Sequence, residues 1–377
     1  MTDDREARLD TPLARALVCR IARNGPISVC EYMAACLYDP DHGYYRHQPV
    51  LGRSADFVTA PEISQVFGEL IGLWCAVVWQ SMGSPASFDL VELGPGRGTL
   101  MRDALRATRS VPQFHASAAV MLVECSGALT AIQRTTLDDV DVPIAWHAHS
   151  DVLSHSKRPA IIIGNEFLDC QPRRQWVRRG STWRERLVGI DDRDRLVFQL
   201  AEAAGAAAAE IDALAGSATE GDVFEPSSHT QIVGTLATRL TMAALLIDYG
   251  HTEPSVGDSF QAVRAHRTEH PLTAPGLADL TMHVDFAALV REVAQRPELA
   301  VDGPVPQAAF LGGLGAVERA SRLMAANPGL AATIETGVAR LLSPHGMGSR
   351  FKAIGIRSTH LPPLPGLSLV DNEGLGG

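Results

Sequence analysis

The stretch Val91-Glu92-Leu93-Gly94-Pro95-Gly96-Arg97-Gly98-Thr99-Leu100 decides the fold of this 377-residue chain. It joins the apolar run Phe88–Leu93, which predicts a strand, to Thr99–Arg106, which predicts a helix. Glycines in such a turn let the backbone approach a ligand closely, and the start of the following helix offers free N–H groups. We therefore expect a small-molecule site at this turn.

The spacing of the glycines and the acidic residue before them indicate which class of ligand the turn binds. A dinucleotide fold favours G-x-G-x-x-G, whereas Gly94, Gly96 and Gly98 are one residue tighter and follow Glu92. A carboxylate there would repel a pyrophosphate and suits a cationic or hydroxyl-bearing ligand. S-adenosyl-L-methionine carries an α-ammonium and a sulfonium, so we predict that Glu92, Gly94, Pro95, Gly96 and Gly98 bind it. The alternative is a tight turn without a ligand.

Glu124 is the second cofactor candidate. It closes the apolar run Val120–Val123 and lies 26 residues after Gly98. An acidic residue about 20 residues beyond a glycine turn often accepts hydrogen bonds from ribose hydroxyls. The alternative is an ordinary acidic residue at a strand end.

The rest of the chain predicts an α/β fold of the Rossmann-like type. Apolar runs that alternate with helical segments indicate a mostly parallel, doubly wound sheet. The predicted strands include Ile144–Trp146, Ala160–Ile163 and Ala244–Ile247, and the predicted helices include Gly127–Thr136. Leu187–Ile190 and Leu196–Leu200 indicate an appended β-hairpin.

Residues 1–85 predict an N-terminal helical portion ahead of a methyltransferase-type domain over 86–377. Thr11 before Pro12 predicts one helix start, and the capping box Ser28–Glu31 predicts a second. We expect a long helix from Pro61 to about Gln80, a surface helix over Ala201–Ala218 and irregular chain up to Phe57. Residues 252–280 predict a long loop, within a loop-rich insertion near 252–310.

Composition excludes several classes of protein. The net charge of −10 argues against a nucleic-acid partner, because phosphate binding calls for a basic surface. No apolar run is long enough to span a membrane. The six cysteines form no C-x-x-C pair, so we expect reduced thiols, no metal site and a cytoplasmic protein. The acidic opening resembles neither a signal nor a transit peptide; a location in the mitochondrial matrix would require a transit peptide missing from this chain.

Five motifs in order resemble the MidA-like family, the methyltransferases that assist assembly of respiratory complex I in mitochondria and their bacterial relatives. The resemblance covers about Pro26 to Ile356, and beside the glycine turn it is carried by Asp56–Glu69, Gly164–Asp169, Leu246–His251, Asp279–Phe286 and Met347–Lys352. It implies a class I methyltransferase and, for the mitochondrial members, symmetric dimethylation of an arginine on a complex I subunit. The chain departs from the family at Cys170-Gln171-Pro172, Met282 and Gln307–Gly315, which concerns the acceptor and not the cofactor site.

An arginine acceptor stays protonated, since its pKa exceeds about 12, and so needs carboxylates to hold it. Asn165, Glu166 and Asp169 follow the buried strand Ala160–Ile163, where ligands of such sheets bind. We predict Glu166 and Asp169 as catalytic and Asn165 as cofactor-binding. The alternative is a helix start with Asn165 as its N-cap.

The later motifs contain further candidate residues for the acceptor site. Asp248 ends the strand Ala244–Ile247 and is predicted to orient the acceptor, unless it only forms a turn. His283 with Asp285 is a candidate base, and Arg350 and Lys352 are candidates for binding a carboxylate.

With the resemblance, the segment Thr59–Gln65 implies a lid. Its residues Thr59, Pro61, Glu62 and Gln65 would then reach the cofactor or the acceptor. Without the resemblance, Pro61 and Glu62 are also what a helix start without a ligand shows.

The sequence thus predicts an S-adenosylmethionine-dependent methyltransferase that acts on arginine of a protein partner. Two rival functions stay open: an assembly chaperone that binds the cofactor without catalysis, and a small-molecule methyltransferase. An NAD-dependent dehydrogenase is disfavoured by Glu92. The oligomeric state is not predicted.

Overall fold

A computed structural model of the chain describes residues 8–47, 58–201 and 207–368. Contacts divide the chain into two compact units, and the chain passes between them several times. The first unit is built from 1–57, 169–228 and 251–289, and the second from 58–168, 229–250 and 290–377. Residues 1–85 are therefore shared between the units.

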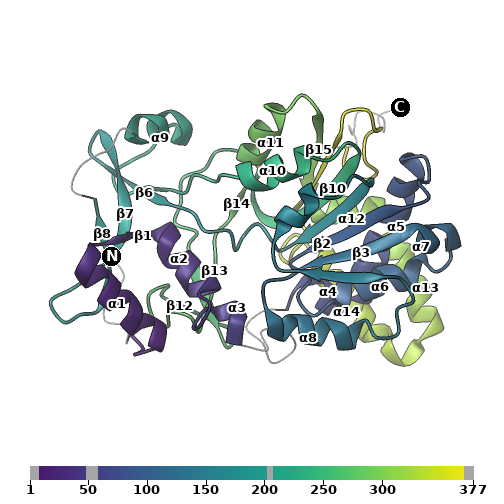
Figure 1. Cartoon of the computed structure of the whole chain (residues 1–377), viewed down its shortest axis with the longest axis horizontal. Coiled ribbons are helices and arrows are strands. Elements are labelled where there is room, and N and C mark those ends of the chain that lie inside the picture. The colour runs from purple at the N-terminus through teal and green to yellow at the C-terminus, as the bar shows by residue number, and fades with distance from the viewer. Residues whose placement is uncertain (1–7, 48–57, 202–206, 369–377) are drawn as a thin grey trace. The chain divides into compact units, whose positions relative to one another are not determined.

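The second unit contains the predicted parallel sheet (Figure 1). Among the described residues its strands run in the order β15-β16-β10-β5-β2-β3-β4. The pairs β10–β5, β5–β2, β2–β3 and β3–β4 are parallel, whereas β16 is antiparallel to both of its neighbours. Their bounds are β2 Phe88–Leu93, β3 Ala118–Val123, β4 Ile144–His147, β5 Ala160–Asn165, β10 Met242–His251, β15 Leu299–Pro306 and β16 Phe351–Ser358.

Helices fill the connections between these strands. The strand predictions are confirmed within a few residues, and the helix after the glycine turn is two residues longer than predicted. The helical elements of this unit are α4 Ala60–Ile63, α5 Gln65–Ser81, α6 Thr99–Thr108, α7 Pro112–Ser117, α8 Gly127–Thr136, η1 Ser150–Ser154, α10 Thr230–Ala237, α12 Gln307–Gly313, α13 Ala316–Ala326, η2 Pro328–Leu330 and α14 Ala331–Leu342.

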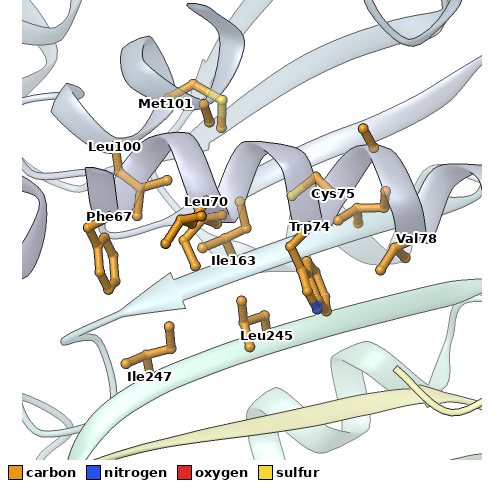
Figure 2. Close-up of a cluster of buried hydrophobic side chains, with 14 of the residues drawn as sticks. Phe67, Leu70, Trp74, Cys75, Val78, Leu100, Met101, Ile163, Leu245 and Ile247 are labelled. Atoms are coloured by element: carbon orange, nitrogen blue, oxygen red, sulfur yellow. The ribbon is translucent and has the colours of Figure 1, made fainter. Parts of the chain in front are cut away.

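Helix α5 is apolar around most of its circumference, as expected for a helix that is covered on both sides. Figure 2 shows its side chains Phe67, Leu70 and Trp74 toward the strand residues, with α6 on the other side. The helices approach closely because α5 has glycine there: a Cβ on Gly72 would lie 2.5 Å from Ala104 Cα. The buried packing of α5 therefore fixes α6, the helix that follows the glycine turn.

The prediction of one long helix from Pro61 to Gln80 is wrong at Ser64. This residue is extended, with φ −154° and ψ 130°, and its hydroxyl caps the new helix by accepting from Val66 N at 3.3 Å. The carbonyl of Ile63 packs against Gly337 of α14, where a Cβ would lie only 2.9 Å away. The helix is therefore interrupted at Ser64 where the chain packs against α14, an element far away in the sequence.

The first unit holds the N-terminal helices and two antiparallel sheets. The cap at Thr11 and the capping box Ser28–Glu31 are confirmed, and Leu13, Leu17 and Ile21 are buried. The elements are α1 Pro12–Asn24, β1 Ile27–Ser28, α2 Val29–Tyr38, α3 Tyr44–His47, β6 Gln175–Arg179, β7 Thr182–Ile190, β8 Leu196–Leu200, α9 Ala207–Ala215, β9 Val223–Phe224, β11 Gln261–Arg264, β12 Arg267–Glu269, β13 Asp279–Thr281 and β14 Val284–Asp285, and α11 Phe286–Ala294 crosses the unit boundary.

Three predictions in the first unit need correction. The β7–β8 hairpin is confirmed, but it belongs to an antiparallel sheet with β1, β6 and β9. The segment 252–280 is not one loop, because β11 pairs with β12 and β13 and the bidentate ion pair Arg264–Glu269 joins two of these strands. The predicted helix Ala201–Ala218 is described from Ala207 as α9 and ends at Ala215, three residues earlier than predicted. The described residues do not include 48–57, which contain the start of the motif Asp56–Glu69, or 202–206. The chain just before residue 48 was predicted to be irregular, but it contains the short helix α3.

Candidate functional site

The order of strands in the large sheet reverses between β2 and β5, so a crevice is expected at their carboxyl ends. The pairing register of β2 with its two neighbours brings the predicted site residues to this edge of the sheet. Leu93, the last residue of β2, pairs with Val123 of β3 on one side and with Gly164 of β5 on the other. The glycine turn, Glu124 and Glu166 therefore emerge from three neighbouring strands at the same edge.

The glycine turn has the backbone that its sequence requires. Gly94, Gly96 and Gly98 have φ values of 63°, 55° and 80°, a region that residues with a Cβ rarely adopt. Gly94 N donates to Val123 O at 3.0 Å, and Gly98 N donates to Pro95 O at 2.8 Å. Gly98 is the N-cap of α6 and has no side chain to cap it. The predicted strand-turn-helix is confirmed.

Glu92 is a buried carboxylate within β2. Its side chain has 3% exposure, and Oε2 has no hydrogen-bond partner among the described residues. Burial, and then the charge of Glu124, raises the pKa of Glu92 to about 8. A buried carboxylate without a partner is costly. A cationic group of a ligand would offset that cost, so Glu92 fits the ammonium of S-adenosylmethionine.

Glu124 follows β3 directly and is held in one orientation. Its backbone N donates to His147 O at 2.8 Å, and its Oε1 accepts from Ser126 N at 2.8 Å. Burial raises the pKa of Glu124 to about 7. A fixed carboxylate beside the glycine turn fits an acceptor of hydrogen bonds from ribose hydroxyls.

Gln133 of α8 was not predicted as a site residue. Its Nε2 donates to Glu124 Oε2 at 3.2 Å and to Gly96 O at 2.8 Å. The sequence signal for it is positional: Gln133 stands four residues from both Leu129 and Leu137, on the buried stripe of its helix. A fully buried glutamine on such a stripe must have polar partners, and here they belong to the site.

Glu166 directly follows β5 and has an unusual backbone. Its φ is 52°, and its N donates to Ile247 O at 2.8 Å. Glu166 Oε1 accepts from Ala60 N at 3.0 Å and from Asn165 Nδ2 at 3.2 Å. The alternative of a helix start with Asn165 as its N-cap is wrong, because β5 continues through Asn165 and Glu166 is left-handed. Glu166 and Asp169 therefore do not share a helix face.

Asn165 lies at the last position of β5 and is 9% exposed. Its Nδ2 points to Glu166, while Oδ1 is buried without a partner among the described residues. Glu92 Oε2 and Asn165 Oδ1 are therefore two polar atoms near the carboxyl edge of the sheet that have no partner among the described residues. Such atoms are candidates for ligand contacts.

Helix α4 carries the predicted lid residues. Thr59 is its N-cap but makes no capping bond with its side chain, and Pro61 is buried in the first turn. Glu62 Oε1 accepts from the hydroxyl of Thr99, the first residue of α6. Gln65, in α5, donates to Glu69 at 3.2 Å. Glu62 thus joins α4 to the helix after the glycine turn, and motion of these residues as a lid stays a prediction.

Asp248 is buried within β10 and binds backbone. Its Oδ2 accepts from Leu168 N at 2.8 Å, and its Oδ1 accepts from Tyr249 N at 2.9 Å. These bonds fix the segment that follows Glu166. Orientation of an acceptor by Asp248 stays a prediction.

Asp169 and His283 belong to the first unit. Asp169 O accepts from Met282 N at 3.0 Å, and His283 N donates to Ser259 Oγ at 2.9 Å. Asp285 is buried, accepts from Ala288 N at 2.9 Å and has Oδ1 3.9 Å from His251 Nδ1. The structure thus brings His251 to Asp285, a pairing that the sequence did not predict.

Arg350 and Lys352, the candidates for binding a carboxylate, lie at the start of β16. Lys352 is the second residue of β16 and Arg350 lies just before that strand. Burial lowers the pKa of Lys352. No group of three or more His, Cys, Asp or Glu that could hold a metal occurs within residues 8–47, 58–201 and 207–368. None of the helices described there is long and apolar enough to cross a membrane.

Comparison with known proteins identifies relatives over most of the chain. Residues 70–305 match a family described as "Putative S-adenosyl-L-methionine-dependent methyltransferase". The protein arginine methyltransferase NDUFAF7, mitochondrial, of Bos taurus is 35% identical, and the match covers 92% of this chain and 83% of the relative. The Homo sapiens protein of that name is 36% identical, over 90% and 82% of the two chains.

A solved structure shows the same fold. The crystal structure of a Burkholderia thailandensis protein bound to S-adenosyl-homocysteine superposes with a TM-score of 0.85 at 27% identity. It covers 96% of this chain and 97% of that one. The central sheet described above is thus that of a class I methyltransferase.

Proposed function

The chain belongs to this family of S-adenosyl-L-methionine-dependent methyltransferases, and from that premise we propose that it methylates arginine side chains of a protein. The observation that carries the proposal is the set of carboxylates at one edge of the sheet, Glu92, Glu124 and Glu166. The relatives named protein arginine methyltransferase give the acceptor class.

We propose that the donor half of the site is formed by β2, β3 and the glycine turn. S-adenosylmethionine, when bound, supplies a methyl group activated by its sulfonium. Glu92 would bind the ammonium of this molecule, and Glu124 would accept from its ribose hydroxyls. The left-handed glycines leave the backbone open to close approach, so the turn would hold the rest of the ligand without side-chain interference.

The acceptor half is proposed to centre on Glu166. A guanidinium stays protonated in water, so the enzyme must orient one nitrogen and draw the positive charge away from it. Glu166 Oε1 is fixed by Ala60 N and Asn165 Nδ2, and the left-handed backbone adds strain of ~1 kcal/mol or more. A strained, oriented carboxylate at the sheet edge supports a role in binding the acceptor.

We further propose a respiratory complex I subunit as the protein substrate, as the family resemblance implies. The cytoplasm is our proposed location, supported by six free cysteines that suit a reducing compartment. The curated relatives are named mitochondrial, so fractionation of cells that express the tagged chain tests this point. Recovery with organelles or membranes would contradict a cytoplasmic location.

The test of the acceptor is transfer of label from S-adenosylmethionine to the purified candidate subunit. We expect label on arginine with the wild type, loss of at least a hundredfold in rate with Glu166→Gln, and little change with Glu335→Gln, an exposed glutamate of α14. Label only in the low-mass fraction would instead support a small-molecule methyltransferase. Cofactor binding without transfer to protein would support an assembly chaperone.

A further inference from the structure

Gln133 occupies a central place in the hydrogen bonds around the glycine turn. It is fully buried and lies on α8, which begins after the capping residue Ser126. Its Nε2 has two hydrogens and two acceptors, Gly96 O at 2.8 Å and Glu124 Oε2 at 3.2 Å. Its Oε1 accepts from Trp146 Nε1 at 3.1 Å. One amide therefore connects the turn, the carboxylate and β4.

The packing of Gln133 reaches the last glycine of the turn as well. A Cβ built on Gly98 would lie 3.5 Å from Gln133 Cγ and 3.6 Å from its Cα. Gln133 thus bonds the turn at Gly96, and a Cβ at Gly98 would be in ordinary van der Waals contact with it. Its other neighbour, Trp146, is fixed in turn by the guanidinium of Arg134, which stacks 4.0 Å from the centre of the indole ring.

The two oxygens of Glu124 have different donors. Oε1 accepts from Ser126 N, a backbone group that begins α8, and Oε2 accepts from Gln133 Nε2. The backbone donors Ser126 and Cys125 directly follow Glu124 in the chain, so their bonds do not tie the carboxylate to the glycine turn. The bond from Gln133 fixes the plane of the carboxylate relative to Gly96.

We propose that Gln133 is a positioning residue of the methyl-donor site, which fixes the carboxylate of Glu124 relative to the glycine turn so that both meet one adenosyl ligand. The inference rests on the proposed role of Glu124 toward the ribose. Gln133 itself need not touch the ligand. Its effect on affinity acts through Glu124, and the bond to the carbonyl of Gly96 anchors its amide.

The first test measures binding of S-adenosyl-homocysteine by calorimetry. Gln133→Met keeps an unbranched side chain of similar length and removes the amide. We expect its Kd to rise about tenfold or more, because two hydrogen bonds to the site are lost. The matched control is Gln113→Met, an exposed glutamine of α7, with a Kd within about twofold of the wild type.

A double-mutant cycle separates positioning from general loss of structure. If Gln133 acts through Glu124, Glu124→Gln with Gln133→Met should bind little more weakly than Glu124→Gln alone. Full additivity of the two losses would overturn the proposal. In turnover assays, Gln133→Met should raise KM for S-adenosylmethionine and leave kcat within about threefold.

The outcomes also separate this inference from the proposed function. Wild-type affinity in a folded Gln133→Met variant would overturn the positioning role and leave the donor site standing. If Gln133→Met fails to fold, Trp146→Phe provides the second variant: it removes one bond to Gln133 Oε1 but keeps both Nε2 bonds, so its Kd should stay within about threefold. A Trp146→Phe loss as large as that of Glu124→Gln would contradict the inference. No binding by the wild type would instead contradict the donor site itself.

Discussion

At the scale of single residues, the proposed donor site depends on Glu92, an acidic residue whose ionisation is costly in the ligand-free protein. Glu92 is buried in β2 and has an oxygen without a partner among the described residues. Sequence predicted its role from charge alone, since a carboxylate disfavours a pyrophosphate. It could not predict the degree of burial, which depends on helices and strands brought together by the fold.

The first prediction concerns the stability of the ligand-free protein. The pKa of Glu92 is raised from 4.5 to about 8 by burial and then by Glu124, so the folded state keeps a proton that the unfolded chain loses above pH 4.5. Stability therefore falls as pH rises between these values, by ~1.4 kcal/mol per pH unit for this group. Glu92→Gln removes this dependence. In thermal unfolding, its Tm should exceed that of the wild type at pH 8, and the difference should shrink toward pH 5.

A difference in Tm that is the same from pH 5 to pH 8 would contradict this account of Glu92. Glu335→Gln is the control, because this glutamate is exposed on α14. Its Tm should follow that of the wild type across the range.

The second prediction concerns the left-handed glycines. Gly98 and Gly83 have similar φ values, 80° and 84°, and a Cβ on either meets nothing closer than 3.5 Å. Alanine at each position should therefore cost a similar ~1–2 kcal/mol in the free energy of unfolding. Only Gly98→Ala should also weaken binding of S-adenosyl-homocysteine, by tenfold or more. Denaturant unfolding and calorimetry measure the two effects, and equal loss of affinity in both variants would contradict a specific role for the turn.

At the scale of elements, sequence predicted most strands and helices of the parallel sheet, because apolar runs and capping residues are local signals. It failed where distant contacts decide. Ser64 divides α4 from α5 where Ile63 packs on Gly337 of α14. Asn165 continues the strand instead of capping a helix, and Glu166 N, just beyond the strand, donates to Ile247 O. Gln133 was missed because its partners, Gly96, Glu124 and Trp146, lie on three other segments of the chain.

The third prediction concerns an ion-pair cluster that joins three helices. Glu69 of α5 is 2% exposed and binds Arg106 of α6 at 3.0 Å and Arg319 of α13 at 2.7 Å. Burial alone would raise the pKa of Glu69, but the hydrogen bonds and charges of Arg319 and Arg106 lower it below 4.5. Its stabilisation is thus present above pH 4.5 and is lost as pH falls below that value.

We expect Glu69→Gln to lower the free energy of unfolding at pH 7 by about 1–2 kcal/mol, a modest loss because both arginines reach solvent. The loss should shrink below pH 4. Denaturant unfolding at pH 7 and pH 3.5 measures it. A loss of the same size at both pH values would show that the charge of Glu69 is not its cause.

At the scale of the whole molecule, sequence predicted the class of fold and the family but not how the chain is distributed. The boundary between the units falls between Leu168 and Asp169, inside one motif, and α11 crosses another boundary. Composition does not change at these points, so no local signal marks them. The candidate site divides accordingly: Glu92, Glu124, Glu166 and Asp248 belong to one unit, and Asp169 and His283 belong to the other.

Glu92 and the glycine turn are proposed to hold the methyl donor. Binding of a cationic amine should drive ionisation of Glu92, whose pKa is about 8 in the ligand-free protein, so the complex should release protons near pH 7.5.

The most direct measurement is calorimetric titration of S-adenosyl-homocysteine at pH 7.5 in two buffers of different ionisation enthalpy, with the wild type and Glu92→Gln. We predict proton release with the wild type, and with Glu92→Gln an affinity at least tenfold lower and reduced proton release. Equal affinity and equal proton release in the two proteins would contradict the account.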